Sequence, residues 1–309
     1  MPVSTHSDSQ DPTLVTPSLL RDWPLPAPGE DKYSRGAVLV IGGARATPGA
    51  ALLAGTSALR AGAGKITLAV AESVAVPVGV ALPECGSVGL PETPEGSVTG
   101  EGLNRISSYL DRADAVLIGP GLDHPDLAES LLRALLEREK SLDTTDDGGA
   151  PAIVLDAFAL GGLVEIQDDL GPWRGRLILT PNPTEAGILL GRDVKDLGAD
   201  VAEIARRFDA VVSCQGYISG PSADDPTESA LWKITTGYGG LGTSGSGDVL
   251  AGAIAGLRAR GTSDAQAACW GTHLHAAAAD RLASKLGPLG FLARELADQL
   301  PALMLELNT

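Results

Sequence analysis

The chain has 309 residues, of which 44% are hydrophobic, so it can build a sizeable core and is too apolar for a disordered protein. It carries 23 Lys and Arg against 39 Asp and Glu, a formal charge of −16. This charge repels phosphates and excludes a general binder of nucleic acid or of an anionic membrane. A local group of backbone N–H donors can still hold an anionic small molecule.

The N-terminal stretch and the cysteines indicate a compartment. Residues 1–17 are rich in Ser, Thr and Asp, and they lack the basic start and apolar stretch of a signal peptide. Every apolar run is shorter than the roughly 18 residues that span a bilayer. The cysteines, Cys85, Cys214 and Cys269, are odd in number and far apart, so we expect free thiols. The sequence thus predicts a cytoplasmic protein with neither membrane nor nucleic acid among its partners.

The first predicted elements set the fold class. Residues 1–30 are polar and then Pro-rich, and are expected to form an N-terminal tail or lead-in on the surface, ahead of a single domain over residues 31–309. The apolar run 37–41 predicts a strand buried on both faces. An Ala- and Leu-rich stretch over 48–61 predicts a helix, and 65–70 a second strand. Strand, helix and strand in this order indicate a right-handed parallel crossover.

The alternation of strands and helices continues to the C-terminus. Further strands are predicted at 115–118, 152–156, 176–180 and 210–213, helices at 126–140, 184–190, 200–208, 247–260, 263–286 and 291–307, and a hairpin from 217–220 and 230–235. Residues 141–150 are expected to be a polar surface loop, with the acidic cluster 143–147 in solvent. These elements predict one α/β sandwich with a mostly parallel sheet and helices on both faces.

Residues that can carry chemistry stand where the predicted strands end. In open parallel sheets, ligands bind beyond the carboxyl ends of the strands. These ends carry Gly42-Gly43, Gly119-Pro120-Gly121, Asp156-Ala157-Phe158 and the segment from Thr180 to Glu185. Each segment alone is equally consistent with a turn, but four of them on one sheet edge predict a binding site.

The strongest signal is the Gly-rich run from Gly237 to Asp248, which leads directly into an apolar helix. Free N–H groups and the positive end of the helix dipole make such a junction an anion site. Asp248 is either a helix-terminal carboxylate or a general base beside a phosphate, and the dipole is expected to favour its ionised form. The run is neither a Walker A loop nor a Rossmann fingerprint, because it lacks the Gly-Lys-Ser/Thr ending and does not follow the first strand.

The motif Gly245-Ser-Gly-Asp248, with the Val-Leu-Ala-Gly after it, resembles the C-terminal signature of ribokinase-like small-molecule kinases. Other segments resemble one branch of that superfamily, the ADP/ATP-dependent NAD(P)H-hydrate dehydratases. In chain order they are Gly36 to Gly43, Pro48-Gly-Ala50, Ala58 to Gly64, Ile118 to Leu122, Val154 to Ala157, Leu179-Thr-Pro181 with Glu185, and Thr243 to Gly256. The resemblance implies a ribokinase-like three-layer α/β/α sandwich with a central, mostly parallel sheet.

The resemblance also implies a repair reaction. NADH or NADPH that has added water to its nicotinamide ring is dehydrated with the terminal phosphate of ADP or ATP. The ring hydroxyl is a poor leaving group and its phosphate ester a good one, so the enzyme first phosphorylates the hydroxyl. Mg²⁺ as a cofactor, the NAD(P)H hydrate and an adenine nucleotide as small-molecule partners, and a homo-oligomer are implied with it.

Site residues follow from the matched positions. Asp248 is implied as the base, and Gly245, Ser246 and Gly247 as the lining of the anion hole. The substrate-binding positions are Ala50, Gly121, Asn182 and Asp248, and the nucleotide-binding positions are Gln215, Gly216, Tyr217, Ile218, Ser219 and Gly247.

The chain departs from the family pattern at four of these segments. Gln215 stands where the family has Lys, which removes a positive charge from the nucleotide segment. Phe158 replaces an Asp, Tyr238 falls in a segment that reads Asn-Pro-Gly in the family, and Asn182 replaces a His. The missing Lys at Gln215 predicts a weaker nucleotide affinity than that of a relative with the Lys.

Four further residues have two interpretations each. Glu185 ends an Asn-x-x-Glu pattern by which ribokinase-like kinases organise Mg²⁺, so it either holds the metal through water or caps a helix. His273 and His275 lie mid-helix among Ala residues and are expected to pack or to form a core hydrogen bond. Trp270 is expected to anchor helices or subunits.

Two other functions remain open. One is a kinase of a small alcohol, such as a sugar or a vitamin precursor, with the same Asp248 and anion hole. The lack of extra strands between the first strand and its helix argues against a sugar kinase. The other is a non-catalytic nucleotide-binding relative, which the altered Gln215, Phe158 and Tyr238 favour.

Overall fold

The computed structural model describes residues 11–27, 29–141, 149–221, 229–237 and 239–308. Its strands are β1 (Thr13–Val15), β2 (Ala37–Ile41), β3 (Lys65–Ala71), β4 (Gly86–Leu90), β5 (Ala115–Ile118), β6 (Ala152–Leu155), β7 (Leu177–Leu179), β8 (Ala210–Cys214), β9 (Tyr217–Pro221) and β10 (Ser229–Ile234). Its α-helices are α1 (Pro17–Asp22), α2 (Pro48–Arg60), α3 (Ala75–Ala81), α4 (Ser107–Leu110), α5 (Pro125–Ser141), α6 (Phe158–Glu165), α7 (Pro183–Leu190), α8 (Leu197–Phe208), α9 (Ser246–Ala259), α10 (Asp264–Leu286) and α11 (Ala293–Asn308). None of these helices is both long and apolar enough to cross a bilayer.

The strands form one sheet in the order β1-β10-β9-β8-β7-β6-β5-β2-β3-β4. All neighbours are parallel except β9, which is antiparallel to both β8 and β10. The six apolar runs predicted as strands therefore lie in one mainly parallel sheet, and the predicted hairpin is β9–β10. Both expectations are confirmed.

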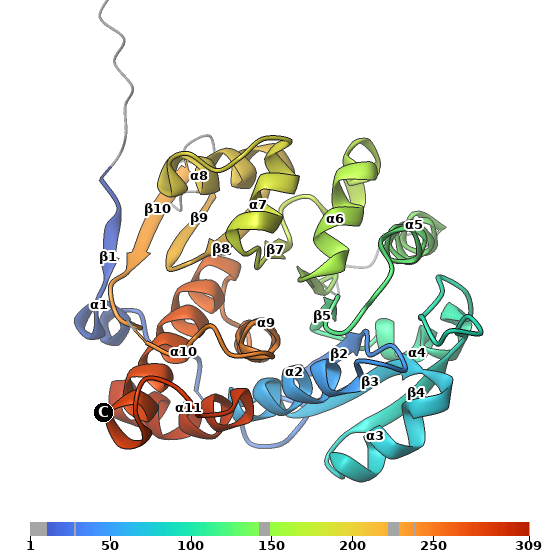
Figure 1. Cartoon of the computed structure of the whole chain (residues 1–309), viewed down its shortest axis with the longest axis horizontal. Coiled ribbons are helices and arrows are strands. Elements are labelled where there is room, and N and C mark those ends of the chain that lie inside the picture. The colour runs from blue at the N-terminus through green and yellow to red at the C-terminus, as the bar shows by residue number, and fades with distance from the viewer. Residues whose placement is uncertain (1–10, 28, 142–148, 222–228, 238, 309) are drawn as a thin grey trace, which may run out of the picture.

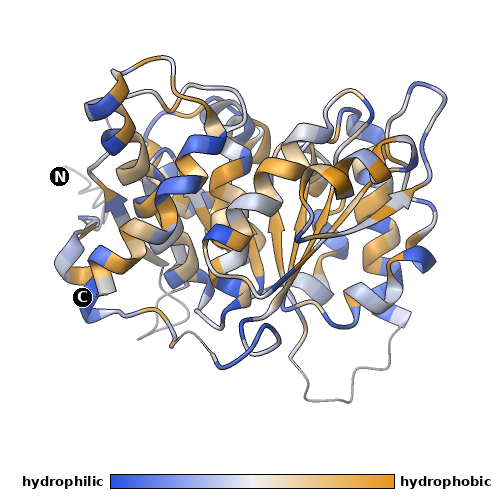
Figure 2. Ribbon diagram, turned by 90° about the horizontal axis from the view of Figure 1, so that it is seen from below, coloured by the Kyte–Doolittle hydropathy of each residue, from blue (hydrophilic) through white to orange (hydrophobic). Residues whose placement is uncertain are grey.

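Helices cover the sheet on both faces and make a three-layer α/β/α sandwich (Figure 1). Side chains of β2 alternate between two cores, because successive residues of a strand point to opposite faces. Val38 and Val40 join the core under α2, α9, α10 and α11, whereas Leu39 and Ile41 join the core under α5, α6, α7 and α8. Figure 2 shows the strands in hydrophobic colour in the middle of the molecule. The expected fold class is thus confirmed.

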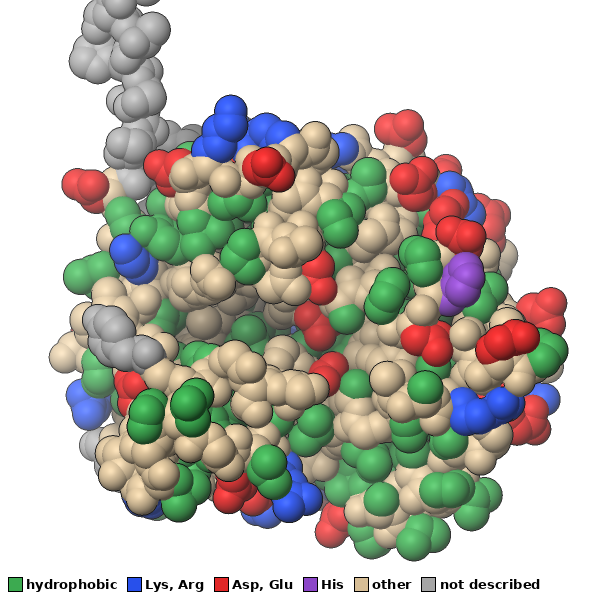
Figure 3. All heavy atoms as spheres, in the orientation of Figure 1, with side chains coloured by type: hydrophobic (Ala, Val, Ile, Leu, Met, Phe, Trp, Pro, Cys, Tyr) green, Lys and Arg blue, Asp and Glu red, His purple; other side chains and the backbone are tan. Residues whose placement is uncertain are grey.

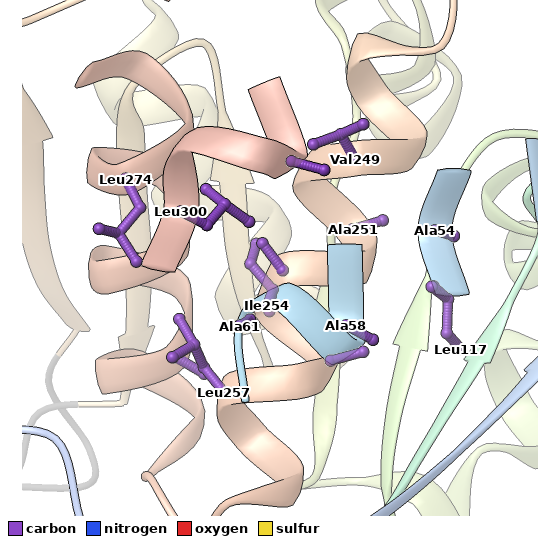
Figure 4. Close-up of a cluster of buried hydrophobic side chains, with 14 of the residues drawn as sticks. Ala54, Ala58, Ala61, Leu117, Val249, Ala251, Ile254, Leu257, Leu274 and Leu300 are labelled. Carbon is purple, nitrogen blue, oxygen red and sulfur yellow. The ribbon is translucent and has the colours of Figure 1, made fainter. Parts of the chain in front are cut away.

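Close packing of α2 against α9 fixes the helix that carries the Gly-rich motif. A Cβ on Gly252 would lie 2.1 Å from the carbonyl oxygen of Ala54, and one on Gly256 would lie 2.4 Å from that of Ala58, so the two backbones touch. Figure 4 shows Ala54 and Ala58 of α2 next to α9. The hydroxyl of Ser57 on α2 also donates a hydrogen bond to the Val249 carbonyl, at 2.6 Å. The start of α9 is therefore held from the α2 side.

The N-terminal segment differs from the expected surface lead-in. β1 pairs in parallel with β10 and closes one edge of the sheet, and Val15 and Leu20 are buried. The Trp23 ring stacks on Trp232 with centroids 6.4 Å apart. Trp270 on α10 donates its indole N–H to the Trp23 carbonyl at 2.9 Å, so Trp270 anchors this segment to the helix layer. Residues 143–147 and Tyr238 lie outside the described residues.

Candidate active site

The carboxyl ends of β2 and β5 meet in a pair of interlocked Gly-rich loops. The N–H of Gly43 donates to the Pro120 carbonyl, and the N–H of Ala44 to the Gly121 carbonyl, both at 2.8 Å. Gly121 has a φ of 77°, and a Cβ there would lie 3.1 Å from the Cβ of Ala50. The structure therefore brings together Ala50 and Gly121, two positions predicted to face the substrate.

Asp156 follows β6 at the same edge and is buried. Its Oδ1 accepts a hydrogen bond from the Thr180 hydroxyl at 2.9 Å, which links the ends of β6 and β7. The next residue, Ala157, has a φ of 52°, a conformation that a non-Gly residue rarely adopts. The chain then enters α6 with Phe158, whose side chain is 43% exposed where the family has a carboxylate.

Asn182 and Glu185 form a capping box at the start of α7. Asn182 Oδ1 accepts from the N–H groups of Thr184 and Glu185, at 2.9 and 3.0 Å, and Glu185 Oε2 accepts from the Asn182 N–H at 2.8 Å. Glu185 therefore caps α7 through Oε2, which agrees with the capping interpretation of this residue. Among the described residues no group of three or more His, Cys, Asp or Glu is arranged to hold a metal by itself.

The Gly-rich run ends at α9 as an open helix N-terminus. Gly245 is the N-cap with a φ of 87°, and the first helical bond runs from the Val249 N–H to its carbonyl at 3.2 Å. In the described part of the chain, the N–H groups of Gly245, Gly247 and Asp248 donate to no protein acceptor. Such groups at a helix N-terminus bind an anion well. The predicted anion site therefore has three open donors beside the Asp248 carboxylate.

Ser246 lies in this turn but faces inward. Its N–H donates to the Thr243 carbonyl at 3.1 Å, and its hydroxyl lies 3.0 Å from Nε2 of His275 on α10. Ser246 is 5% exposed. Of the three residues predicted to line the anion hole, Gly245 and Gly247 offer open N–H groups, whereas Ser246 holds the loop to α10.

Burial and like charge raise the pKa values of the carboxyl groups at this edge. Burial raises the pKa of Asp248 to about 6, although the helix dipole was expected to favour the ionised form. Burial and then the charges of Asp248 and Glu185 raise the pKa of Asp156 to about 7. Burial also raises the pKa of Glu185. Figure 3 shows acidic side chains gathered at the middle of this face, beside a hollow.

The predicted nucleotide segment is a tight hairpin turn. Gln215 and Gly216, with φ of 44° and 83°, form the two-residue connection between β8 and β9 at the carboxyl edge of the sheet. Gln215 is exposed, but Ile218 and Ser219 are buried, and the Ser219 hydroxyl donates to the Ala230 carbonyl at 2.9 Å. The turn can meet a ligand, whereas the Ile218 and Ser219 side chains build the sheet.

Sequence reasoning did not single out Lys233, and it placed Asp156 in a strand-end segment of the expected binding site without giving its side chain a role. Lys233 on β10 pairs across the sheet with Tyr217, and its Nζ lies 4.7 Å from the centroid of that ring, one residue from the turn. This register places a cation near the position where Gln215 replaces a Lys. The sequence pattern does not reveal this neighbour, because the long loop between β9 and β10 leaves it undetermined which residues of the two strands pair.

Comparison with known proteins agrees with this geometry. A family model described as NAD(P)H-hydrate dehydratase matches residues 38–302. The ADP-dependent (S)-NAD(P)H-hydrate dehydratase of Xanthomonas campestris is 39% identical over 94% of this chain and 95% of the relative. The bifunctional NAD(P)H-hydrate repair enzyme Nnr of Moorella thermoacetica is 36% identical over 88% of this chain, which spans 50% of that longer relative.

Solved structures show the same fold. The ADP/ATP-dependent NAD(P)H-hydrate dehydratase of Bacillus subtilis, co-crystallised with ATP and Mg²⁺, superposes with a TM-score of 0.72 and 26% identity, over 97% of this chain and all of that one. A ribokinase-like superfamily protein of Enterococcus faecalis superposes with a TM-score of 0.77 and 21% identity, over 96% of this chain and 97% of that one. The expected ribokinase-like sandwich is confirmed.

Proposed function

Because the chain belongs to the NAD(P)H-hydrate dehydratase family, we propose that it dehydrates hydrated NADH and NADPH with the terminal phosphate of ADP or ATP. The observation that carries the proposal is the open N-terminus of α9. There, unpartnered N–H groups and the half-buried carboxylate of Asp248 share one edge of the sheet with Ala50 and Gly121. We propose residues 31–309 as the catalytic domain. β1 adds an edge strand to its sheet, and α1 follows β1.

The nucleotide takes its place between the hairpin turn and α9. The turn with the exposed Gln215, and the Tyr217 ring next to it, are the part of the predicted nucleotide segment that the nucleotide and its phosphates can reach. The N–H groups of Gly245, Gly247 and Asp248 face the terminal phosphate, where the helix dipole favours negative charge. They also stabilise charge that develops on the phosphoryl group during transfer.

Asp248 accepts the proton of the substrate hydroxyl. The hydroxyl oxygen forms a bond to the terminal phosphorus, the bond from phosphorus to the leaving nucleotide oxygen breaks, and the proton passes to Asp248. With a pKa of about 6, Asp248 is ionised at neutral pH and is a stronger base than an ordinary Asp. The ring nitrogen then expels inorganic phosphate, and loss of a proton from the neighbouring carbon restores the nicotinamide double bond.

Mg²⁺ fits the acidic edge of the site. Asp156, Glu185 and Asp248 have pKa values raised by burial and none of them has an ion pair within the described residues, so a divalent cation would relieve their mutual repulsion. Mg²⁺ takes oxygen ligands, keeps several waters and is shared with substrate phosphates. Bound there, it would neutralise phosphate charge, with Glu185 holding it through water.

We also propose a compartment and an oligomeric state for the protein. The described cysteines, Cys85, Cys214 and Cys269, are free, which supports a reducing cytoplasm. Val76 and Val80, 77% and 75% exposed on α3 beside the edge strand β4, support a homo-oligomer in which this apolar face is covered.

The test is a reconstitution with NADH hydrate, ADP or ATP, and Mg²⁺. The proposal predicts recovery of the nicotinamide absorbance with release of one phosphate per NADH. A small-alcohol kinase would convert a sugar or vitamin precursor instead and leave the absorbance unchanged. A non-catalytic relative would bind the nucleotide in calorimetry and release no phosphate. Either of these two results would contradict the proposal.

A further inference from the structure

His275 connects the middle of α10 to the start of α9. It is 6% exposed, and its Nε2 lies 3.0 Å from the hydroxyl of Ser246. Ser246 is the first residue of α9 and stands two positions before Asp248. The contact therefore joins two elements 29 residues apart in sequence at the turn that carries the open N–H groups.

This contact fixes which way the first turn of α9 faces. With its hydroxyl against His275 and its N–H on the Thr243 carbonyl, Ser246 is held on the inner side of the helix. Gly247 is exposed and Asp248 is half-buried, so the residues that follow Ser246 face the open edge of the site. If Ser246 turned, the N–H groups of Gly247 and Asp248 would turn with it.

A neutral imidazole suits this place. Burial lowers the pKa of His275 to about 4, although a hydrogen bond to the Ser246 backbone opposes the shift. The ring is therefore uncharged at neutral pH, with one nitrogen as donor and one as acceptor. It can hold Ser246 without adding a cation that would pair with the Asp248 carboxylate and weaken it as a base.

His273, a second buried histidine on α10, is the natural control for His275. His273 is 7% exposed, and its Nδ1 has no hydrogen-bond partner in the described part of the chain. Burial lowers its pKa as well. It lies two residues along α10 from His275 and makes no hydrogen bond to α9 within the described residues.

We propose that His275 is a positioning residue for phosphoryl transfer. It acts through Ser246 to keep the Gly247 and Asp248 N–H groups and the Asp248 carboxylate oriented toward the open edge of the site. This inference rests on the proposed function of the same site. Preorganised donors stabilise the transition state because they need not move during the reaction, and misplacement by about 1 Å costs on the order of 100-fold in rate. The contact His275–Ser246 supplies that preorganisation from the α10 side, as Ser57 does from the α2 side.

The test is a double-mutant cycle with steady-state kinetics and a thermal melt for each variant. We expect His275→Ala to lower kcat by about 10- to 100-fold, with the KM for the hydrate changed by less than about twofold. Ser246→Ala should show a similar loss, and the double variant should be no slower than the slower single one. His275→Gln keeps an N–H donor of similar reach and should recover most of kcat. His273→Gln is the matched control and should keep the wild-type kcat.

Two results would overturn the inference in an enzyme whose wild type is active. One is a His275→Ala variant with normal kcat, and the other is a double variant whose losses multiply, because independent effects cannot act through one contact. If the wild type bound ADP but did not dehydrate the hydrate, the proposed function would fail instead. The same cycle would then be measured as the Kd of Mg²⁺-ADP, where multiplying losses would again reject a role through Ser246.

Discussion

The negative charge of Asp248 helps to raise the pKa of the buried Asp156 to about 7, so the two carboxyl groups titrate as neighbours at the edge of the sheet. Burial is the larger cause, and the hydrogen bond from Thr180 opposes it. Near neutral pH the pair therefore holds part of a proton, and the charge of one member depends on the other.

The first prediction concerns stability and pH. Folded Asp156 keeps its proton up to about pH 7, whereas an unfolded Asp loses it near 3.8, so ionisation of this group costs stability as pH rises between these values. Asp156→Asn keeps an acceptor for Thr180 and removes the charge. Without Mg²⁺, its Tm should match the wild type near pH 4 and exceed it by a few degrees at pH 8, about 2–4 °C per kcal/mol. If the variant and the wild type had equal Tm values at both pH 4 and pH 8, the pKa of Asp156 would not be raised in the folded protein.

The second prediction is an acid limb in the rate profile. Because Asp248 must be ionised to accept the hydroxyl proton, and its pKa is about 6, kcat should fall by about tenfold per pH unit below that value. The measurement is kcat from pH 4.5 to 8 at saturating substrates. A profile that stays flat down to pH 5 would rule out a base with this pKa.

The third prediction concerns nucleotide affinity. Gln215 lies exposed on the hairpin turn, and a Lys there would add a charged donor, worth about 1.5–3 kcal/mol in a good hydrogen bond to phosphate. Gln215→Lys should tighten Mg²⁺-ADP or Mg²⁺-ATP binding by at least about tenfold in calorimetry. Gln215→Met keeps a similar length without a charge and is the control. Weaker binding in the Lys variant would place the phosphates away from this turn.

The fourth prediction concerns the helix contact that holds the site. Gly252→Ala would place a Cβ 2.1 Å from the Ala54 carbonyl oxygen, so α9 must move away from α2. We expect a loss of about 1–3 kcal/mol in unfolding free energy and a lower kcat. Gly161 on α6 has open space at its Cβ, so Gly161→Ala should stabilise the protein by up to about 1 kcal/mol. Equal melts for the two variants would refute the tight α2–α9 contact.

The sequence predicts those parts of the fold that local pattern encodes. The continuous apolar runs at β2, β3, β5, β6, β7 and β8 are buried on both faces, as a central parallel sheet requires. Other elements depend on tertiary contacts: β1 is a three-residue strand that needs β10 beside it, and α3 contains Pro77 and Gly79, both poor helix formers. Neither has a pattern that local reasoning recognises.

The same division holds in the site. The Gly-rich run into an apolar helix indicates the anion site and Asp248, because backbone conformation and dipole are local properties. The contacts of Ser246 with His275 and of Asp156 with Thr180 join residues 29 and 24 positions apart, and they exist only once the helices and strands are assembled. The raised pKa of Asp248 escapes prediction for the same reason, since the burial that raises it exists only in the packed site.

The central claim, that Asp248 performs the chemical step, is tested most directly by the turnover of Asp248→Asn. The substitution keeps the size and hydrogen-bonding ability of the side chain and removes the basic oxygen, so kcat should fall by about 10²–10⁴-fold while the Kd of Mg²⁺-ADP and the thermal melt change little. Asp126→Asn, at an exposed first turn of α5, is the matched control and should keep full activity. A well-folded Asp248→Asn enzyme with near-normal kcat would contradict the account and leave Asp248 as a helix-terminal carboxylate.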